Sequence, residues 1–309
     1  MARPTRCAHI PTRHGVSPSC VALPSDKTTS WELVLDFLAD HLSTVGRVEW
    51  QQRMARGDVL DASADILPPD APYLPGARIY YYRHLAEEPA VPFQETVLFQ
   101  DEHLLIADKP HFLPVTPGGR YVQQSLLVRL KNRLGTDTLS PIHRIDRETA
   151  GLVVFSLRPQ DRGAYQAMFR DRAVTKAYQA MARFDERLDG PIERRSRIVE
   201  EDGAFYRMTE SAGEPNSETR IEMLERRGEW ALYALSPVTG KRHQLRVHMN
   251  ALGLPIAGDQ FYPRVIRGPE EAEDFANPLR LLAQAIRFTD PITGAERHFE
   301  SQLALQWPD

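Results

Sequence analysis

Apolar residues in the first 85 positions predict a small α+β module. They recur at helical spacing from residue 31, on one face of a helix for which Ser30 is the expected N-cap. A second short helix is predicted around 48–54, and short strands near 57–60 and 76–83. Residues before 30 are rich in Pro, Ser, Thr and Arg and show no periodicity. We therefore expect a flexible tail over 1–29, the module over 30–84, a linker over 85–95 and a larger domain over 96–309.

Short apolar runs typical of strands dominate the larger domain. Three such runs lie at 104–107, 151–156 and 230–235, and residues 219–223 alternate between apolar and charged, as in a half-exposed strand. Helical stretches interrupt the strands near 120–134, 160–171 and 242–252. Because this order is irregular and not a βαβ repetition, the pattern predicts a mixed, mainly antiparallel α+β domain.

Composition excludes several classes of protein. Of 309 residues, 42% are hydrophobic and 26% are charged, which is ordinary for a chain with a sizeable core. Apolar runs stay well short of the ~18 residues of a membrane span, and the basic start lacks the apolar stretch of a secretory signal. Cys7 and Cys20 give no disulfide framework, and with His9 and His14 their spacing matches no common zinc finger. We therefore expect a soluble, cytoplasmic protein without a metal site.

The distribution of charge suggests a polyanionic partner, although the net charge is −4. Arginine supplies 33 of the 38 basic residues, and it is the cation best suited to phosphates and bases. Biased codon usage would produce the same excess, so the excess alone does not decide. However, cations cluster at 126–147 and 241–248, whereas acids gather at 200–202 and 270–274. Such a segregated surface could hold an anionic polymer.

Three short segments are dense in polar residues that could carry chemistry. Asp146 stands between Arg144 and Arg147 at the entrance of a strand, where the arginines would keep it ionised; it could also be a turn residue in a structural ion pair. Tyr178 lies in an extended stretch and would, taken alone, be a core tyrosine. Residues 239–248 place a glycine turn before a basic helix, which could bind an anion or could simply be solvated.

Together these segments resemble the RluA-type family of RNA pseudouridine synthases. The family's H-R-L-D and T-[SA]-G-L motifs match residues 143–146 and 149–152, with Ile145 in place of leucine. Three further family motifs follow in order: K-x-Y-x-A at 176–180, T-G-[RK]-x-H-Q-[IL]-R at 239–246 and L-G-x-P-I-x-G-D at 252–259. The resemblance covers about residues 96–305.

The resemblance is looser elsewhere. Residues 108–115 resemble the family's N-K-P-x-G-x-x-V segment, with Asp108 for asparagine and Phe112 for glycine. Ala283-Gln284-Ala285 stands where L-H-A is usual, a departure away from the catalytic motifs. The N-terminal module resembles a small αL-type RNA-binding module, and Arg47, Arg53 and Arg56 around its second helix would contact RNA.

The resemblance implies an enzyme that isomerises specific uridines in rRNA or tRNA to pseudouridine, without a metal or other cofactor. Asp146 would be the catalytic carboxylate and Arg246 its ion-pair partner. Tyr178 would stack on the flipped uracil and could remove its carbon-5 proton. The stretch 126–133 would hold phosphates. The other expected RNA contacts are Arg144, Lys176, Lys241, Arg242, His243 and Gln244. We expect a monomer with RNA as its partner and no membrane association.

Two other classes remain open from the sequence. One is a non-catalytic RNA-binding protein on the same scaffold, which activity lost in Asp146→Asn would exclude. The other is a metal hydrolase, which full activity in excess chelator would dismiss. Its candidate ligands are His143, His243, His248 and Asp259. The motifs leave open which RNA and which uridine are modified.

Overall fold

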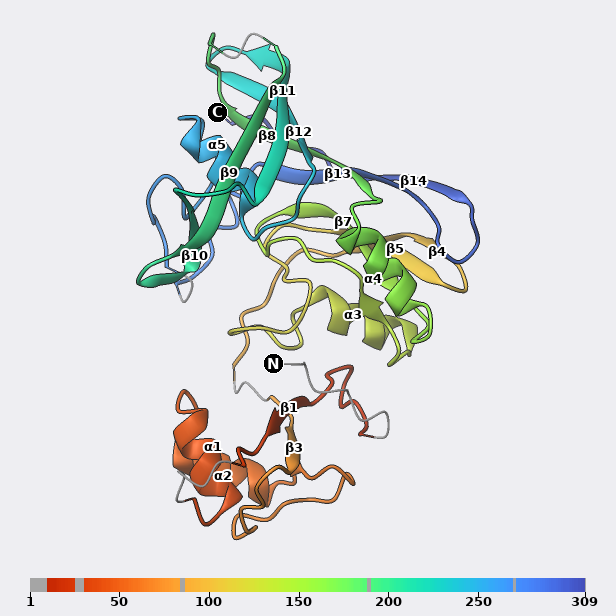
Figure 1. The fold of residues 1–309 in the computed structure, drawn as a ribbon, viewed down its shortest axis with the longest axis vertical. Coiled ribbons are helices and arrows are strands. Elements are labelled where there is room, and N and C mark those ends of the chain that lie inside the picture. The colour runs from red at the N-terminus through yellow and green to blue at the C-terminus, as the bar shows by residue number, and fades with distance from the viewer. Residues whose placement is uncertain (1–9, 26–30, 84–86, 188–189, 269–270, 309) are drawn as a thin grey trace. The chain divides into compact units, whose positions relative to one another are not determined.

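The computed structural model describes residues 10–25, 31–83, 87–187, 190–268 and 271–308 (Figure 1). The chain divides into two compact units, Met1–Glu88 and Pro89–Asp309. The boundary between them falls inside the segment predicted as a linker. The last part of that segment belongs to the larger unit, because Val91 is buried in its core and the Arg129 guanidinium donates to the carbonyl oxygens of Val91 and Phe93 at 2.8 and 2.7 Å.

The smaller unit has an α+β architecture, and its assignment as an RNA-binding module stays a prediction. Two helices pack beside a three-stranded antiparallel sheet of order β1-β3-β2 around the buried rings of Phe37 and Trp50. The predicted N-cap, Ser30, lies outside the described residues. The elements are β1 (Ser19–Ala22), α1 (Val34–His41), α2 (Arg47–Ala55), β2 (Val59–Leu60) and β3 (Arg78–Tyr81).

The prediction of a flexible tail is wrong for residues 10–25. Strand β1 pairs with β3 from Ser19 opposite Tyr81 to Ala22 opposite Arg78, and Leu23 is buried in the core of the unit. This strand exists because its partner is supplied some 60 residues later, so local composition could not reveal it. Residues 1–9 and 26–29 of the predicted tail, with Cys7 and His9, lie outside the described part of the chain.

The arginines around α2 are ion-paired within their own unit. Arg47 donates to Asp36 at 2.6 Å and Arg53 to Glu49 at 2.8 Å, while Arg56 lies 3.3 Å from Asp58. The contact of these three arginines with RNA stays a prediction.

The larger unit is built on one extensive sheet of order β10-β9-β11-β12-β8-β13-β7-β5-β4, with β14 beside β13 and β6 beside β7 (Figure 1). Among the described strands every pairing is antiparallel except that of β13 with β7. The predicted mixed, mainly antiparallel α+β class is therefore confirmed. The strands are β4 (Thr96–Gln100), β5 (Leu104–Lys109), β6 (Ser140–Pro141), β7 (Ala150–Ser156), β8 (Thr175–Arg183), β9 (Ile192–Glu201), β10 (Ala204–Ser211), β11 (Ser217–Arg227), β12 (Trp230–Pro237), β13 (Leu281–Thr289) and β14 (Glu296–Glu300). The helices are α3 (Leu126–Leu134), α4 (Arg162–Arg170) and α5 (Gln244–Ala251).

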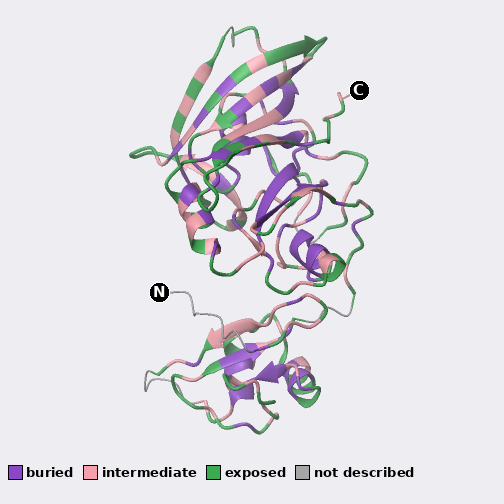
Figure 2. Ribbon diagram, turned by 90° about the vertical axis from the view of Figure 1, so that its right-hand side faces the viewer, coloured by how far each residue is buried: buried purple, intermediate pink, exposed green. Residues whose placement is uncertain are grey.

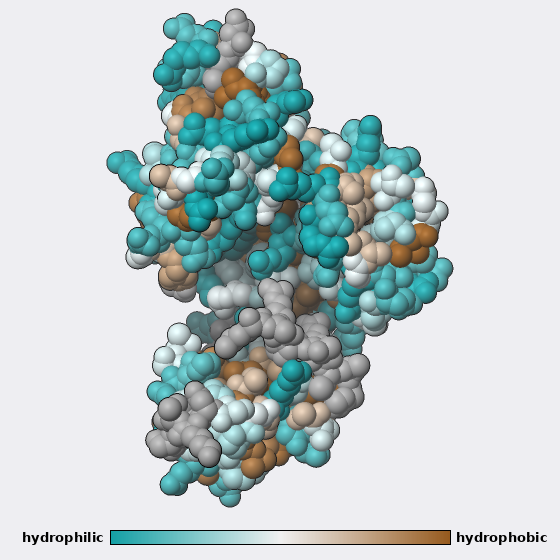
Figure 3. Space-filling model, viewed as in Figure 1, coloured by the Kyte–Doolittle hydropathy of each residue, from teal (hydrophilic) through white to brown (hydrophobic). Residues whose placement is uncertain are grey.

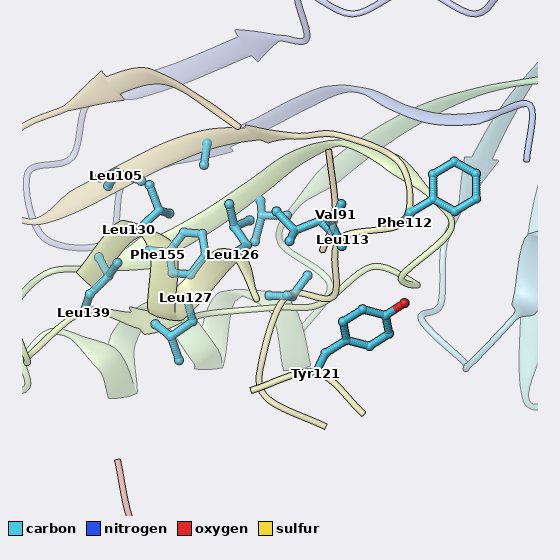
Figure 4. Packing of buried hydrophobic residues seen from close by; sticks show 13 residues of the cluster. Val91, Leu105, Phe112, Leu113, Tyr121, Leu126, Leu127, Leu130, Leu139 and Phe155 are labelled. Atoms are coloured by element: carbon cyan, nitrogen blue, oxygen red, sulfur yellow. The ribbon is translucent and has the colours of Figure 1, made fainter. Parts of the chain in front are cut away.

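Strands β5 and β7 are buried on both faces, and this explains their continuous apolar runs (Figure 2). Alternate residues point to opposite faces: Leu105 and Phe155 pack with α3, whereas Leu104 and Val154 pack with α4. Figure 4 shows Phe155 meeting leucines of α3 in the first of these clusters. Within the described residues, no helix is both long enough and apolar enough to cross a bilayer.

A third cluster carries α5 against the other half of the sheet, where Leu245 and Met249 pack on β8, β12 and β13. Strand β13 lies between β7 and β8, and a Cβ on Gly151 of β7 would come within 2.3 Å of the Ala283 carbonyl oxygen. The glycine of the T-A-G-L motif is thus required by close strand contact. Ala283 also pairs with Tyr178, so the A-Q-A departure lies beside the motif strands and not away from them.

Candidate active site

A pocket of about 970 Å³ opens in the larger unit where three segments meet. These are the loop before β7, the start of β8 and the turn into α5. Strand order brings the first two together, because β7 and β8 flank β13 on its two sides. All nine residues predicted for the site line this pocket: Asp146, Tyr178, Arg246, Arg144, Lys176, Lys241, Arg242, His243 and Gln244.

Arg246 is the centre of the charge network, and its side chain is fully buried. Its Nε and Nη2 donate to the two carboxylate oxygens of Asp259 at 2.8 and 2.7 Å. Its Nη1 lies 3.5 Å from Asp146 Oδ2 and 3.3 Å from Glu148 Oε2. The predicted contact between Arg246 and Asp146 therefore exists, but Arg246 makes its bidentate ion pair with Asp259. The network raises the pKa of Arg246 despite its burial, chiefly through Asp259.

Asp259 can hold Arg246 because the chain around it is itself fixed. Its Oδ1 also accepts the backbone N–H groups of Phe261 and Tyr262, at 2.9 and 3.2 Å. Gly258, just before it, has a φ of 76°, and a Cβ there would lie 2.2 Å from the Pro278 carbonyl oxygen. The glycine of the G-D motif therefore serves to place the carboxylate.

Glu148 is a second buried carboxylate in the pocket, and the sequence analysis assigned it no role. Its Oε1 accepts from Arg147 Nη2 at 2.9 Å and from Gln260 Nε2 at 3.2 Å. Burial raises its pKa, but Arg246 and Arg147 outweigh burial and hold the pKa at about 2. Its position two residues after Asp146 was the available signal, because alternate residues of an extended segment can share a face.

Asp146 is the most accessible of the three carboxylates around Arg246. Its side chain is 22% exposed, compared with 8% for Glu148 and 0% for Asp259. Lys109, fully buried, donates to the carbonyl oxygen of Arg147 at 3.0 Å and so anchors the backbone beside Asp146. Asp146 is therefore the carboxylate that a molecule in the pocket can reach.

Tyr178 faces the same space, and its hydroxyl remains protonated. Burial, and next the Asp146 charge, raise its pKa above the ordinary value for tyrosine. These are the opposite of the surroundings that a phenolate base would need. The geometry therefore favours a ring and hydroxyl donor over a proton acceptor at this position.

The predicted RNA-binding residues divide into two groups. Arg144 and Lys241 are exposed on the pocket wall. Lys176 is half-buried and donates to the Thr239 carbonyl oxygen at 3.3 Å; burial, and next the nearby Arg172, lower its pKa. Arg242 is exposed but is held by backbone carbonyl groups of β10. These four cations can meet phosphates.

The other two, His243 and Gln244, also line the pocket but are buried and hydrogen-bonded within the fold, and their contact with RNA stays a prediction. The Gln244 amide accepts from Thr239 Oγ1 and Lys241 N–H, and it donates to the Glu218 carbonyl oxygen and Thr219 Oγ1, so its hydrogen-bonding capacity is used. His243 is buried, with Nδ1 3.1 Å from the Tyr262 hydroxyl. At the start of α5, the Gln244 N–H donates to the Lys241 carbonyl oxygen at 3.2 Å, and no side chain caps the helix.

The basic stretch 126–133 is also largely held within the fold, although 43% of the Arg133 side chain is exposed, and its role with phosphates stays a prediction. Arg129 fastens residues 91–95 through two carbonyl oxygens and lies 3.4 Å from Glu95. Arg133 reaches Glu95 at the same distance. Lys131 is 2% exposed. These cations lie on α3, whose apolar face is packed on the sheet.

The four candidate ligands of the metal alternative have other partners. His143 Nε2 accepts the Val154 N–H at 3.1 Å, and burial lowers its pKa to about 3. His248 contacts hydroxyl groups of Ser217 and Thr219 at 3.0 and 2.9 Å. His243 and Asp259 are held as described above. No group of three or more candidate ligands gathers anywhere in the described residues.

Comparison with known proteins places the same residues in one family. Residues 103–251 match the family described as RNA pseudouridylate synthase. The dual-specificity RNA pseudouridine synthase RluA of Haemophilus influenzae is 30% identical over 236 residues, which cover 69% of this chain and 95% of that protein. The ribosomal large subunit pseudouridine synthase C of Vibrio vulnificus is 29% identical over 261 residues, covering 84% and 80%. The structure of human RNA pseudouridylate synthase domain containing 4 aligns with a TM-score of 0.53 at 26% identity, over 67% of this chain and 88% of that one.

Proposed function

This chain belongs to the RluA-type family of RNA pseudouridine synthases, and from that premise we propose that it isomerises specific uridines of rRNA or tRNA with Asp146 as the catalytic carboxylate. The observation that carries the proposal is the position of Asp146: it is the accessible member of a carboxylate cluster around a buried guanidinium. A non-catalytic RNA-binding protein would not need a charge held in this way.

The reaction balances without an oxidant, a phosphate donor or a metal. The bond between uracil N1 and ribose C1′ breaks, the ring turns while bound, and C5 joins C1′. The C5 proton leaves and N1 gains a proton, so no atom is lost. Asp146 would act either by attacking the sugar or the base, or by assisting loss of the ribose C2′ proton. An ionised carboxylate is needed in each route.

Arg246 would orient Asp146 through its Nη1, while Asp259 holds the other edge of the guanidinium. Tyr178 would stack on the uracil and donate a hydrogen bond from its protonated hydroxyl. The uridine must leave its helix to enter the pocket, at a cost of a few kcal/mol. Arg144, exposed beside Asp146, would fill the vacated stack, and Lys176, Lys241 and Arg242 would hold neighbouring phosphates.

The test is Asp146→Asn on RNA labelled with tritium at uridine C5, since each turnover releases the label to water. Turnover should be abolished, while RNA affinity stays within a few-fold because phosphate contacts supply most of it. Folding should be little affected, since the Asp146 side chain makes only a 3.5 Å contact with Arg246. Asp185→Asn is the matched control: it is the same change just beyond the far end of β8, and Asp185 does not line the pocket. Tritium release by Asp146→Asn at one per cent of the normal rate or more would contradict the assignment.

A further inference from the structure

Strand β10 leaves its regular pairing with β9 at one place beside the pocket. Ala204 pairs with Glu201, but the next pair is Met208 with Glu200, so three residues of β10 oppose none of β9. Bulges of this kind turn side chains in new directions and are frequent next to active sites. Here the extra residues are Phe205, Tyr206 and Arg207, and the first two line the pocket.

The bulge is held in shape by contacts from three directions. The Arg242 guanidinium donates to the carbonyl oxygens of Phe205 and Arg207, at 2.5 and 3.2 Å. Arg207 pairs with Glu201 at 2.9 Å. At the end of the bulge, the Tyr262 hydroxyl accepts from the N–H of Met208 and donates to its carbonyl oxygen, at 2.8 and 2.9 Å. A conformation with this many contacts is fixed, so the outward direction of Phe205 is built in.

Phe205 is 75% exposed, the highest value among the large hydrophobic side chains of the described residues. On the face shown in Figure 3, hydrophobic side chains form small, scattered patches. Among the exposed large hydrophobic residues of the described chain, only Phe205 and Val238 line the pocket. The Phe205 ring meets Tyr206 edge to face, with centroids 5.5 Å apart. Tyr206 in turn contacts Phe261, which lies under the Arg246 guanidinium. Aromatic rings therefore lead from the rim of the pocket to its charged centre.

We infer that Phe205 is a stacking platform for an unpaired nucleobase next to the target uridine, an inference that rests on the proposed function. A rigid exposed ring beside cations is the arrangement by which proteins hold single-stranded nucleic acid, with bases on rings and phosphates on cations. The cations are Lys241 and Arg242, on the same pocket wall. A docking site for a protein would need an apolar patch of several hundred Å², and a single ring does not supply one.

The first experiment measures binding and turnover of Phe205→Ala, Phe205→Leu and Phe205→Trp on one stem-loop RNA. Stacking of one base on an aromatic ring stabilises a complex enough that Phe205→Ala should raise Kd and KM by about 5- to 140-fold. Phe205→Leu should recover little, since it restores apolar area but no ring, whereas Phe205→Trp should restore binding. Leu224→Ala is the matched control, because Leu224 is an exposed apolar residue of β11 that does not line the pocket. Equal affinities for Phe205→Ala and the unmodified protein would overturn the inference.

The second experiment uses RNAs that lack one base at each position around the target. At one position, loss of the base should weaken binding to the unmodified protein and leave Phe205→Ala unaffected. If, at every position, the affinity lost by removing the base and the affinity lost by Phe205→Ala simply add, Phe205 stacks on none of these bases. Binding is measured by fluorescence anisotropy and does not require turnover. If no pseudouridine forms but base removal and Phe205→Ala are non-additive at one position, the proposed function fails and the stacking inference stands. If pseudouridine forms but the two changes are additive at every position, the proposed function stands and the stacking inference fails.

Discussion

Asp259→Asn tests whether the bidentate pair with Arg246 supports catalysis or only the fold. The Asp259 carboxylate accepts four hydrogen bonds, two from Arg246 and two from backbone N–H groups. An asparagine of the same shape has one acceptor oxygen and one donor NH2 group. If its oxygen keeps the backbone contacts, the NH2 group faces the guanidinium, donor against donor. In either orientation of the amide, the fully buried Arg246 guanidinium loses part of the negative charge that balances it.

Removing one partner of a buried ion pair costs about 3–5 kcal/mol. For a unit the size of Pro89–Asp309, each kcal/mol lowers Tm by roughly 2–4 °C, so a decrease of roughly 10 °C is expected. Below its own lowered Tm the variant is folded, but Arg246 can shift relative to Asp146. Displacements of about 1 Å can reduce rates about 100-fold, and kcat per folded molecule should decrease to that extent.

Asp290→Asn separates the two effects. Asp290 is as buried as Asp259 and also accepts two backbone N–H groups, but it lies in the turn after β13 and pairs with Arg297, at 3.3 Å, where Asp259 pairs with Arg246 of the pocket. It should lower Tm without changing kcat per folded molecule. The assay is tritium release at saturating RNA, 15 °C below each Tm. Unchanged kcat in a destabilised Asp259→Asn would refute the orienting role.

Two further outcomes are expected. Burial lowers the pKa of His143 to about 3 and those of His111 and His248 to about 4, below the ordinary 6.5 of the unfolded chain. Their contribution to stability is therefore complete above pH 6.5 and is lost as the pH falls toward 4, so the free energy of unfolding should drop by a few kcal/mol between pH 7 and 5. A flat profile would be inconsistent with three imidazoles that the fold keeps neutral. Deleting residues 1–88 should preserve turnover of a short stem-loop RNA. It should change the slope of log affinity against log salt by less than about one unit, because residues 31–83 carry eight acids against five arginines. A larger change in slope would establish phosphate contacts by this module.

The sequence alone was enough to select the groups proposed for catalysis and to give their order along the chain. Asp146, Tyr178 and Arg246 lie in short motifs whose residue types the chemistry requires, and all three line one pocket. Period-2 and period-3.6 patterns likewise predicted the strands and helices, because each reflects which face of its own element is buried. Such information is local, and a sequence displays it directly.

Tertiary structure decided which polar groups are available and which are used internally. Gln244 and Lys131 have the same chemistry as RNA-binding residues, but the first is consumed by four hydrogen bonds and the second is buried. Arg246 pairs bidentately with Asp259 because the turn at Gly258 brings that carboxylate beside the guanidinium. Phe205 is exposed because a bulge in β10 turns its side chain outward. Whether a cation meets a carboxylate, a carbonyl group or solvent depends on ångström-scale distances between segments far apart in the chain, and these distances exist only once the sheet has formed.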